Sequence, residues 1–292
     1  MIFRESEVAA GALSGTLCES GAREAPLALI HPGSGPTDRD GNNPLGVAAG
    51  AYRMLARELA GLGVDTVRID KRGMYGSAGA GDPNAVVIDD YADDIRAWLD
   101  AFARPRVVLI GHSEGGVSVT LGARDEPRVA GLVLLAGLGR KVADILRGQF
   151  RANPFLAPVL AQALGAVDAL ERGARLDPAT LPGELRPLFP GPVQGFLIDM
   201  MTRDPALMLA QTRVPVLIAQ GGRDIQVTHE DADRLHAARP DAERADFPLM
   251  SHVLKDCAGG DRLANLMTYA SADLPLTPGL AARVAQFVRR VV

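Results

Sequence analysis

The chain has 292 residues, of which 47% are hydrophobic and 23% charged, so it can bury a large core and is neither disordered nor fibrous. Its formal net charge of -4, with Lys and Arg scattered along the chain, gives no basic surface, so we expect no nucleic-acid partner. Glu5 and Glu7 stand where a signal peptide needs an apolar core, and no apolar run approaches the length of a membrane span. The two cysteines, Cys18 and Cys257, lie far apart without metal-binding spacing. We therefore expect a soluble, cytoplasmic protein with no membrane span, no disulfide framework and no metal.

Strand and helix patterns alternate along most of the chain. Residues 7–18 alternate weakly, which predicts a short antiparallel pair at a sheet edge. Short apolar runs predict buried strands at residues 26–30, 64–70, 106–110, 129–135 and 214–219, with a weaker one at 242–247. Apolar residues at helical spacing predict helices at residues 45–62, 85–102, 117–124 and 278–292. This alternation implies an α/β fold with a mainly parallel sheet covered by helices on both faces.

Residues 140–213 break the alternation. They contain no strand-like run, only helical segments punctuated by prolines. Within them, an apolar stripe at a spacing of 3.6 residues runs from Leu156 to Val167. We interpret residues 140–213 as an inserted helical cap, and residues 1–139 and 214–292 together as one α/β core.

The strongest functional pattern is Gly111-His112-Ser113-Glu114-Gly115, which follows the apolar run 106–110 and precedes a helical segment. A serine hydroxyl is a poor nucleophile until a tight, exposed turn holds it within reach of a base, and flanking glycines leave room for such a turn. The stretch fits the G-x-S-x-G nucleophile elbow, which makes Ser113 the candidate nucleophile. The alternative interpretation is an ordinary strand-to-helix turn with a capping serine.

A serine nucleophile needs a histidine base and an acid, and after an elbow they follow in the order serine, acid, histidine. Four of the five histidines fit poorly, because two precede or adjoin the serine and two fall on the helix expected after the strand at 214–219; they are His31, His112, His229 and His236. His252 lies in a loop after the last predicted strand, so we predict that it is the general base. Asp224 follows the strand at 214–219 and is the predicted acid.

The reaction also needs two backbone N–H groups directed at the developing oxyanion. One comes from the residue after the nucleophile, which is Glu114, and one from the loop after an early strand. The turn Gly33-Ser34-Gly35 is flexible enough to direct an amide inward. We assign Ser34 to this role, with Gly35 as the neighbouring alternative.

Together these motifs resemble the α/β-hydrolase superfamily. More narrowly, they resemble bacterial serine esterases of the dienelactone-hydrolase-like and serine-aminopeptidase-like group. The resemblance spans nearly the whole chain except the cap, and its motifs are the loop 31–42, Asp70-Lys71-Arg72-Gly73, the elbow, and Met250 to Lys255. It implies the α/β-hydrolase fold.

By this resemblance, Ser113, Asp224 and His252 correspond to the family's triad, and the turn at residues 33–35 corresponds to its oxyanion loop. One departure is Pro32, which separates His31 from Gly33 where relatives often have histidine directly before glycine, so the identity of the second oxyanion amide stays open. Another is Ser113 itself, which stands where true dienelactone hydrolases have cysteine and therefore favours ester hydrolysis by serine.

The expected function is thus that of a serine hydrolase that cleaves carboxylic esters of short to medium acyl chain, acting on a small-molecule ester without a cofactor. A serine peptidase or amidase of the same fold and a non-catalytic hydrolase-fold binding protein are the alternatives, and a homo-oligomer remains open. The cap contributes apolar side chains such as Phe150, Phe155 and Leu156, which predict a hydrophobic pocket over Ser113.

Two other interpretations of the loop at 33–49 fail on single residues. Gly33-x-Gly35 after a strand imitates a dinucleotide fingerprint, but Asp38 occupies the place of the third glycine. Asp38, Asp40 and Asn42 imitate the start of a calcium loop, but Asn43 stands where glycine is needed, and Ala49 replaces the bidentate glutamate. We expect these charges to brace the loop through hydrogen bonds.

Overall fold

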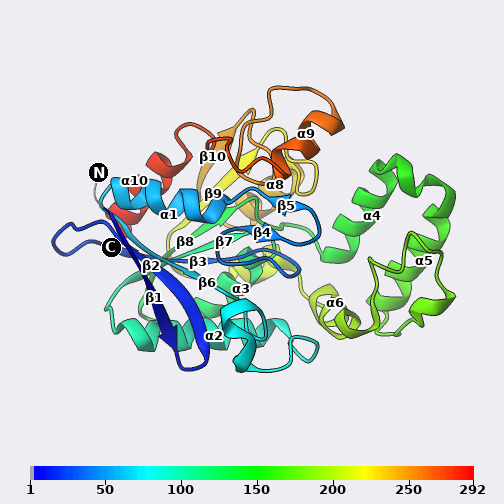
Figure 1. Ribbon diagram of the computed structural model, residues 1–292, viewed down its shortest axis with the longest axis horizontal. Coiled ribbons are helices and arrows are strands. Elements are labelled where there is room, and N and C mark those ends of the chain that lie inside the picture. The colour runs from blue at the N-terminus through cyan, green and yellow to red at the C-terminus, as the bar shows by residue number, and fades with distance from the viewer. Residues whose placement is uncertain (1–2) are drawn as a thin grey trace.

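The computed structural model describes residues 3–292, and its centre is an eight-stranded sheet with the strand order β1-β2-β6-β3-β7-β8-β9-β10 (Figure 1). The strands are β1 (Arg4–Ala10), β2 (Leu13–Glu19), β3 (Leu27–His31), β6 (Asp65–Ile69), β7 (Val107–His112), β8 (Val129–Leu135), β9 (Val216–Gly221) and β10 (Glu243–Phe247). The hairpin β1–β2 is antiparallel and joins β6 antiparallel, while the other neighbours pair in parallel. The predicted mainly parallel sheet with an antiparallel edge is confirmed.

Helices cover both faces of the sheet. They are α1 (Ala51–Gly61) and α10 (Leu280–Val291) on one face, with α2 (Ile88–Phe102), α3 (Gly115–Gly122) and α8 (His229–Ala238) on the other. Successive residues of a strand point to opposite faces, so Ala28 and Ile30 of β3 pack with α1 and α10. Leu27 and Leu29 pack with the other three helices. A strand buried on both faces needs a continuous apolar run, which is why these strands could be recognised in the sequence.

The predicted helix at 45–62 was wrong in its first turns. The helix α1 begins at Ala51, and Val47 lies in the short strand β5 (Val47–Ala48), which pairs with β4 (Asn42–Asn43). Gly46 and Gly50 adopt φ values of 108° and 60°, which break a helix and which glycine adopts without strain. The periodic apolar residues before Ala51 therefore belong to a hairpin.

The sequence predicts neither helix α9 nor the 3-10 helix η1. Helix α9 (Arg262–Tyr269) begins at Asp261, whose side chain accepts the amide of Ala264 at 2.8 Å. The 3-10 helix η1 spans Tyr75–Ala80. Three more 3-10 helices lie within residues 140–213, where proline-punctuated helical segments were predicted; they are η2 (Pro154–Val159), η3 (Pro178–Thr180) and η4 (Gly191–Val193). Each of these 3-10 helices contains proline or glycine, which in a sequence are typical of loops.

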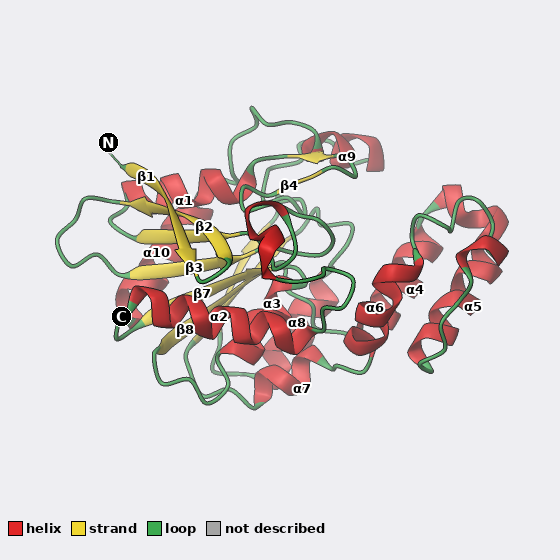
Figure 2. Cartoon of the chain, turned by 60° about the horizontal axis from the view of Figure 1, so that its bottom comes forward, coloured by secondary structure: helices red, strands yellow, loops and turns green. Residues whose placement is uncertain are grey.

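Residues 140–213 form α4 (Val142–Ala152), α5 (Leu160–Glu171), α6 (Gln194–Met201) and α7 (Pro205–Ala210). Helices α4, α5 and α6 stand apart from the sheet (Figure 2), and their inward side chains form a hydrophobic core of their own around Phe150, Val167 and Leu170. By contrast, Leu209 of α7 is fully buried in the core beneath the sheet. We call α4–α6 the helical cap from here on.

None of the helices within residues 3–292 combines the length and the apolar character that crossing a membrane would require.

Candidate active site

Ser113 sits at the sharp turn between β7 and α3. It adopts a left-handed φ of 55°, an uncommon and strained conformation for a residue with a Cβ, and its amide donates to the carbonyl of Leu135 at 2.9 Å. Such a turn is possible because Gly115 passes the preceding loop so closely that a Cβ there would lie 2.6 Å from the carbonyl oxygens of His31 and Pro32. A nucleophile elbow needs a strand before the serine, a strained backbone at the serine and a glycine where the chain packs closely, and all three are present here.

Asp224 and His252 meet at the carboxyl ends of the neighbouring strands. His252 Nδ1 lies 2.7 Å from Asp224 Oδ2, whose side chain is fully buried. The other carboxylate oxygen, Oδ1, accepts the amides of Gln226 at 2.8 Å and Val227 at 2.9 Å. The carboxylate can only accept, so Nδ1 carries the proton and Nε2 is left with a free lone pair. The pair is arranged as an acid that orients a base.

Ser113 and His252 line the same pocket, although no hydrogen bond joins their side chains within residues 3–292. Such bonds are often long before substrate binds, so the geometry is compatible with proton transfer.

The loop after β3 presents a free amide at Ser34. In the described part of the chain, neither Ser34 N–H nor Glu114 N–H has a hydrogen-bond acceptor. Ser34 lines the same pocket as Ser113, and Glu114 follows Ser113 in the chain. The amide of Gly33 is engaged, because it donates to the Tyr52 hydroxyl at 3.2 Å. Ser34 therefore stays the predicted donor, with Gly35 beside it at a φ of 68° as the alternative.

His112 and Tyr52 form a buried connection that the sequence analysis missed. The Tyr52 hydroxyl lies 2.7 Å from His112 Nδ1, and His112 Nε2 lies 2.7 Å from the backbone carbonyl of His252. A carbonyl only accepts, so Nε2 carries the proton and Tyr52 donates to Nδ1. Burial, and then the neighbouring His252, lower the pKa of His112 to about 3, so it stays neutral. Through Tyr52 this connection links the oxyanion loop to the histidine loop.

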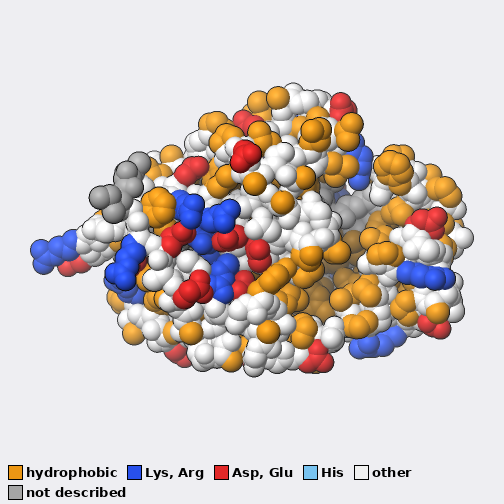
Figure 3. All heavy atoms as spheres, in the orientation of Figure 1, with side chains coloured by type: hydrophobic (Ala, Val, Ile, Leu, Met, Phe, Trp, Pro, Cys, Tyr) orange, Lys and Arg blue, Asp and Glu red, His pale blue; other side chains and the backbone are white. Residues whose placement is uncertain are grey.

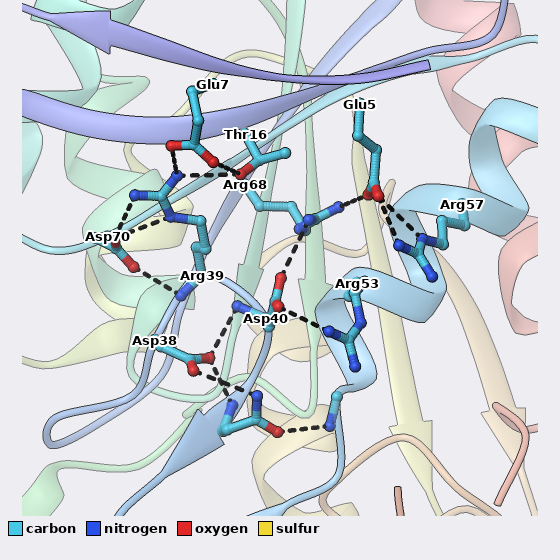
Figure 4. Close-up of polar contacts among 12 residues, drawn as sticks. Glu5, Glu7, Thr16, Asp38, Arg39, Asp40, Arg53, Arg57, Arg68 and Asp70 are labelled. Carbon is cyan, nitrogen blue, oxygen red and sulfur yellow. Dashed lines mark hydrogen bonds and ion pairs between the residues drawn. The ribbon is translucent and has the colours of Figure 1, made fainter. Parts of the chain in front are cut away.

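The expected bracing of the loop by its charges is confirmed (Figure 4). Asp38 Oδ1 accepts the amides of Asp40 and Asn42 at 2.9 and 2.8 Å, which closes the turn on itself. Arg39 then anchors the turn to the sheet, since its Nε and Nη2 donate to Asp70 Oδ2 at 2.9 and 2.6 Å. Asp40 also pairs with Arg68 at 3.1 Å. These carboxylates are occupied by protein partners, and no cluster able to hold a metal ion was found among the described residues.

The pocket beside Ser113 has a volume of about 140 Å³ and is lined by core residues, several of them polar, including Thr37, Asn43 and Gln226. Among the described lining residues none comes from 140–213, so the cap does not cover Ser113 as expected. Cap side chains line an adjoining cleft of about 460 Å³ instead, where Phe150 and Leu156 face α9. Figure 3 shows hydrophobic side chains along the hollow between the cap and the rest of the molecule. Gln226 and Tyr269 line both cavities and join them.

Two buried histidines predict that the protein loses stability in mild acid. Burial lowers the pKa of both His31 and His112 to about 3, far below the value in an unfolded chain. Between about pH 6.5 and 3 the unfolded state therefore binds more protons, and the free energy of unfolding should fall by about 1.4 kcal/mol per pH unit for each histidine. Each unfolded-state histidine is only half protonated at pH 6.5, so the full slope is reached about one pH unit lower, and we expect a loss of about 3 kcal/mol from pH 6.5 to 5, measured by urea unfolding.

The control for this prediction is His31→Gln, which removes one of the two titrating rings and should halve the slope over the same pH range. A free energy of unfolding that is constant between pH 6.5 and 5 would contradict the prediction.

Known proteins match both the sequence and the fold. The family model described as serine aminopeptidase, S33, matches residues 45–255. Esterase EstD from Thermotoga maritima is 24% identical over 242 residues, which cover 79% of this chain but 54% of EstD, so the chain spans about half the length of this relative. The α/β hydrolase GrgF from Penicillium sp. sh18 is 16% identical with a TM-score of 0.61, over 100% of this chain and 99% of GrgF.

A second solved structure, Est1E from Butyrivibrio proteoclasticus with bound ferulic acid, is 18% identical with a TM-score of 0.60, over 98% of each chain. At these sequence identities, the two solved structures support the assignment of the fold alone. The fold is that of the α/β hydrolases.

Proposed function

Because the chain belongs to the serine aminopeptidase S33 family of the α/β-hydrolase superfamily, we propose that it is a serine hydrolase that cleaves carboxylic esters through an acyl-enzyme intermediate. The observation that carries this proposal is the bond of 2.7 Å between His252 and a fully buried Asp224, in the loops that border a strained Ser113. The similarity to esterase EstD supports ester rather than amide chemistry.

In the proposed reaction, His252 Nε2 takes the proton of Ser113 as Oγ attacks the ester carbonyl. The negative charge that develops on the carbonyl oxygen is held by the amides of Ser34 and Glu114. Collapse of this intermediate breaks the bond to the alcohol, which leaves with the proton from His252 and produces an acyl-Ser113. A water molecule then attacks in the same way, releasing the carboxylic acid and restoring the Ser113 hydroxyl. No cofactor or metal enters these steps.

We further propose a preference for short to medium acyl chains, about four to eight carbons, on the basis of the size of the two cavities. The pocket beside Ser113, at about 140 Å³, is close to the cavity of roughly 150 Å³ that holds a benzene ring. The adjoining cleft offers Phe150, Leu156 and Leu266 to the remainder of the molecule. Each buried CH₂ contributes about 0.8 kcal/mol, or roughly fourfold in kcat/KM, until the pocket is full.

The test of ester and chain-length preference is kcat/KM for p-nitrophenyl esters of increasing acyl length, measured beside aminoacyl p-nitroanilides. We expect values that rise from acetate, reach a maximum near the middle of the series and fall for long chains. A continuous rise to long chains would indicate a lipase-like site instead.

The family name itself favours a second candidate, a peptidase that cleaves aminoacyl amides. Faster cleavage of the anilides than of the esters would support the peptidase function instead of the esterase function. A fluorophosphonate probe separates both enzymes from a non-catalytic binding protein, because only a reactive Ser113 is labelled.

A further inference from the structure

Lys71 is a fully buried lysine next to the candidate active site, and the proposed reaction gives it no role. It follows β6 and is 2% exposed. Its Nζ donates to the backbone carbonyl of Gly33 at 2.8 Å and lies 3.8 Å from Glu114 Oε1. A buried ammonium is costly unless it is paired and hydrogen-bonded, so a position that keeps one calls for an explanation.

Of the two groups that contact this ammonium, one is part of the peptide that carries the Ser34 amide, and the other is the side chain of the residue that supplies the second proposed oxyanion amide. The Gly33 carbonyl and the Ser34 N–H share one planar peptide, in which they point in opposite directions. A donor that holds the carbonyl on one side therefore fixes the direction of the N–H on the other. Glu114 supplies the second proposed amide, and its carboxylate is the partner of the same ammonium.

Gly33 is held at its other end as well. Its N–H donates to the Tyr52 hydroxyl, which in turn contacts His112. With both the N–H and the carbonyl of Gly33 bonded to buried side chains, the peptide that follows has little freedom to rotate. A cation on the carbonyl also polarises the amide and strengthens its N–H as a donor.

We propose that Lys71 is a positioning residue that orients and polarises the Gly33–Ser34 peptide, so that the Ser34 amide stabilises the oxyanion of the transition state. The proposal rests on the serine hydrolase function proposed above. Lys71 does not touch the substrate, and it acts through the backbone of the loop. The remaining groups around the ammonium fit this role: the Tyr91 ring lies with its centroid 5.5 Å from Nζ, and the nearby His31 is neutral.

The test is Lys71→Met, which keeps the length of the side chain but removes the charge and the donor. We expect kcat to fall by about 10- to 100-fold with KM within about threefold, less than the loss for deleting an oxyanion donor outright, because the amide is misdirected rather than absent. The specific readout is a pair of ketones carrying the same acyl chain. The trifluoromethyl ketone forms an anionic adduct with Ser113 and should bind about 10- to 100-fold more weakly, while the unreactive methyl ketone should bind as before.

A second variant tests whether the losses in Lys71→Met come from misfolding. In Lys71→Met the Glu114 carboxylate loses its partner, so Lys71→Met/Glu114→Gln removes both charges, and neutral replacement of a buried pair is often tolerated. The same selective loss of trifluoromethyl ketone affinity is expected there. The matched control is Lys255→Met, which deletes the other fully buried lysine, bonded to Ser271 O at 2.5 Å, and should leave the ratio of the two ketone affinities unchanged.

The outcomes separate this inference from the proposed function. If the fluorophosphonate probe labels Ser113 in the wild-type protein, while Lys71→Met and the double variant keep wild-type kcat and trifluoromethyl ketone affinity, the role of Lys71 is overturned and the serine hydrolase stands. Equal losses of affinity for the two ketones would indicate that Lys71 has only a structural role, and they would also overturn the inference. Absence of labelling in the wild-type protein would remove the proposed function and this inference together.

Discussion

Replacing Ser113 with alanine should leave a folded protein whose ester hydrolysis is close to the uncatalysed background. The loss of kcat should be on the order of 10⁶-fold, because the covalent step that the base, the acid and the oxyanion amides all serve no longer exists. The fold should persist, since the substitution removes one oxygen from a turn that Leu135, Gly111 and Gly115 already define. The measurements are ester turnover, fluorophosphonate labelling and urea unfolding of the same preparation.

Ser118 provides the matched control. It lies on α3 shortly after the turn that holds Ser113, is fully buried, and its hydroxyl has no hydrogen-bond partner in the part of the chain that the structure describes. Ser118→Ala should therefore keep wild-type turnover and labelling. Turnover that survives in Ser113→Ala, or labelling that persists without Ser113, would show that another residue is the nucleophile.

The residues of the candidate triad could be proposed from the sequence because each is marked by a local pattern. Ser113 stands between an apolar run and a helix with glycines on either side, and Asp224 and His252 each follow a strand. These strands could be recognised because the sheet is buried on both faces, so each strand is a short, nearly continuous apolar run. The order serine, acid, histidine then left one candidate for each role.

The supporting residues carried no such signal, since their contacts depend on the order of strands in the sheet. Strand β3 lies between β6 and β7, which brings the residues after all three strands to one edge. Lys71 follows β6 and reaches Gly33 after β3, while Tyr52 on α1 reaches His112, 60 residues away. A lysine beside an arginine in a loop is normally taken for a solvated charge, and only the fold reveals that Lys71 is buried.

The residues that line the pocket beside Ser113 could not be predicted from the sequence either. The apolar residues of the cap were expected over Ser113, but a helical apolar stripe serves equally well to pack helices together. In the structure Val167 and Leu170 do so, filling the core shared by α4, α5 and α6. Which apolar residues remain for a substrate depends on where the cap stands relative to α9, a helix that had not been predicted.

The second large loss of kcat is expected from substitutions of His252 and Asp224. His252→Ala should lower kcat about as much as Ser113→Ala, on the order of 10⁶-fold, because triad members act as a unit. Asp224→Asn should cost less, on the order of 10⁴-fold, since the acid only orients and stabilises the base. The amide side chain can still accept the amides of Gln226 and Val227 through its oxygen, but its NH₂ then faces His252 Nδ1. The ring must take the opposite tautomer, which leaves Nε2 protonated and unable to accept the proton of Ser113.

Two readouts tie these losses to proton transfer rather than to folding. Added imidazole should restore part of the activity of His252→Ala, because it can enter the space left by the ring, and it should not restore Ser113→Ala. His229→Ala is the control, since His229 is half-exposed on α8, 3.5 Å from Asp246, and should turn over ester like the wild type. If His229→Ala lost as much activity as His252→Ala, the base would have been assigned to the wrong loop. The graded series, with serine and histidine equal and the aspartate weaker, follows from the geometry because the Asp224 carboxylate reaches Ser113 only through the imidazole of His252.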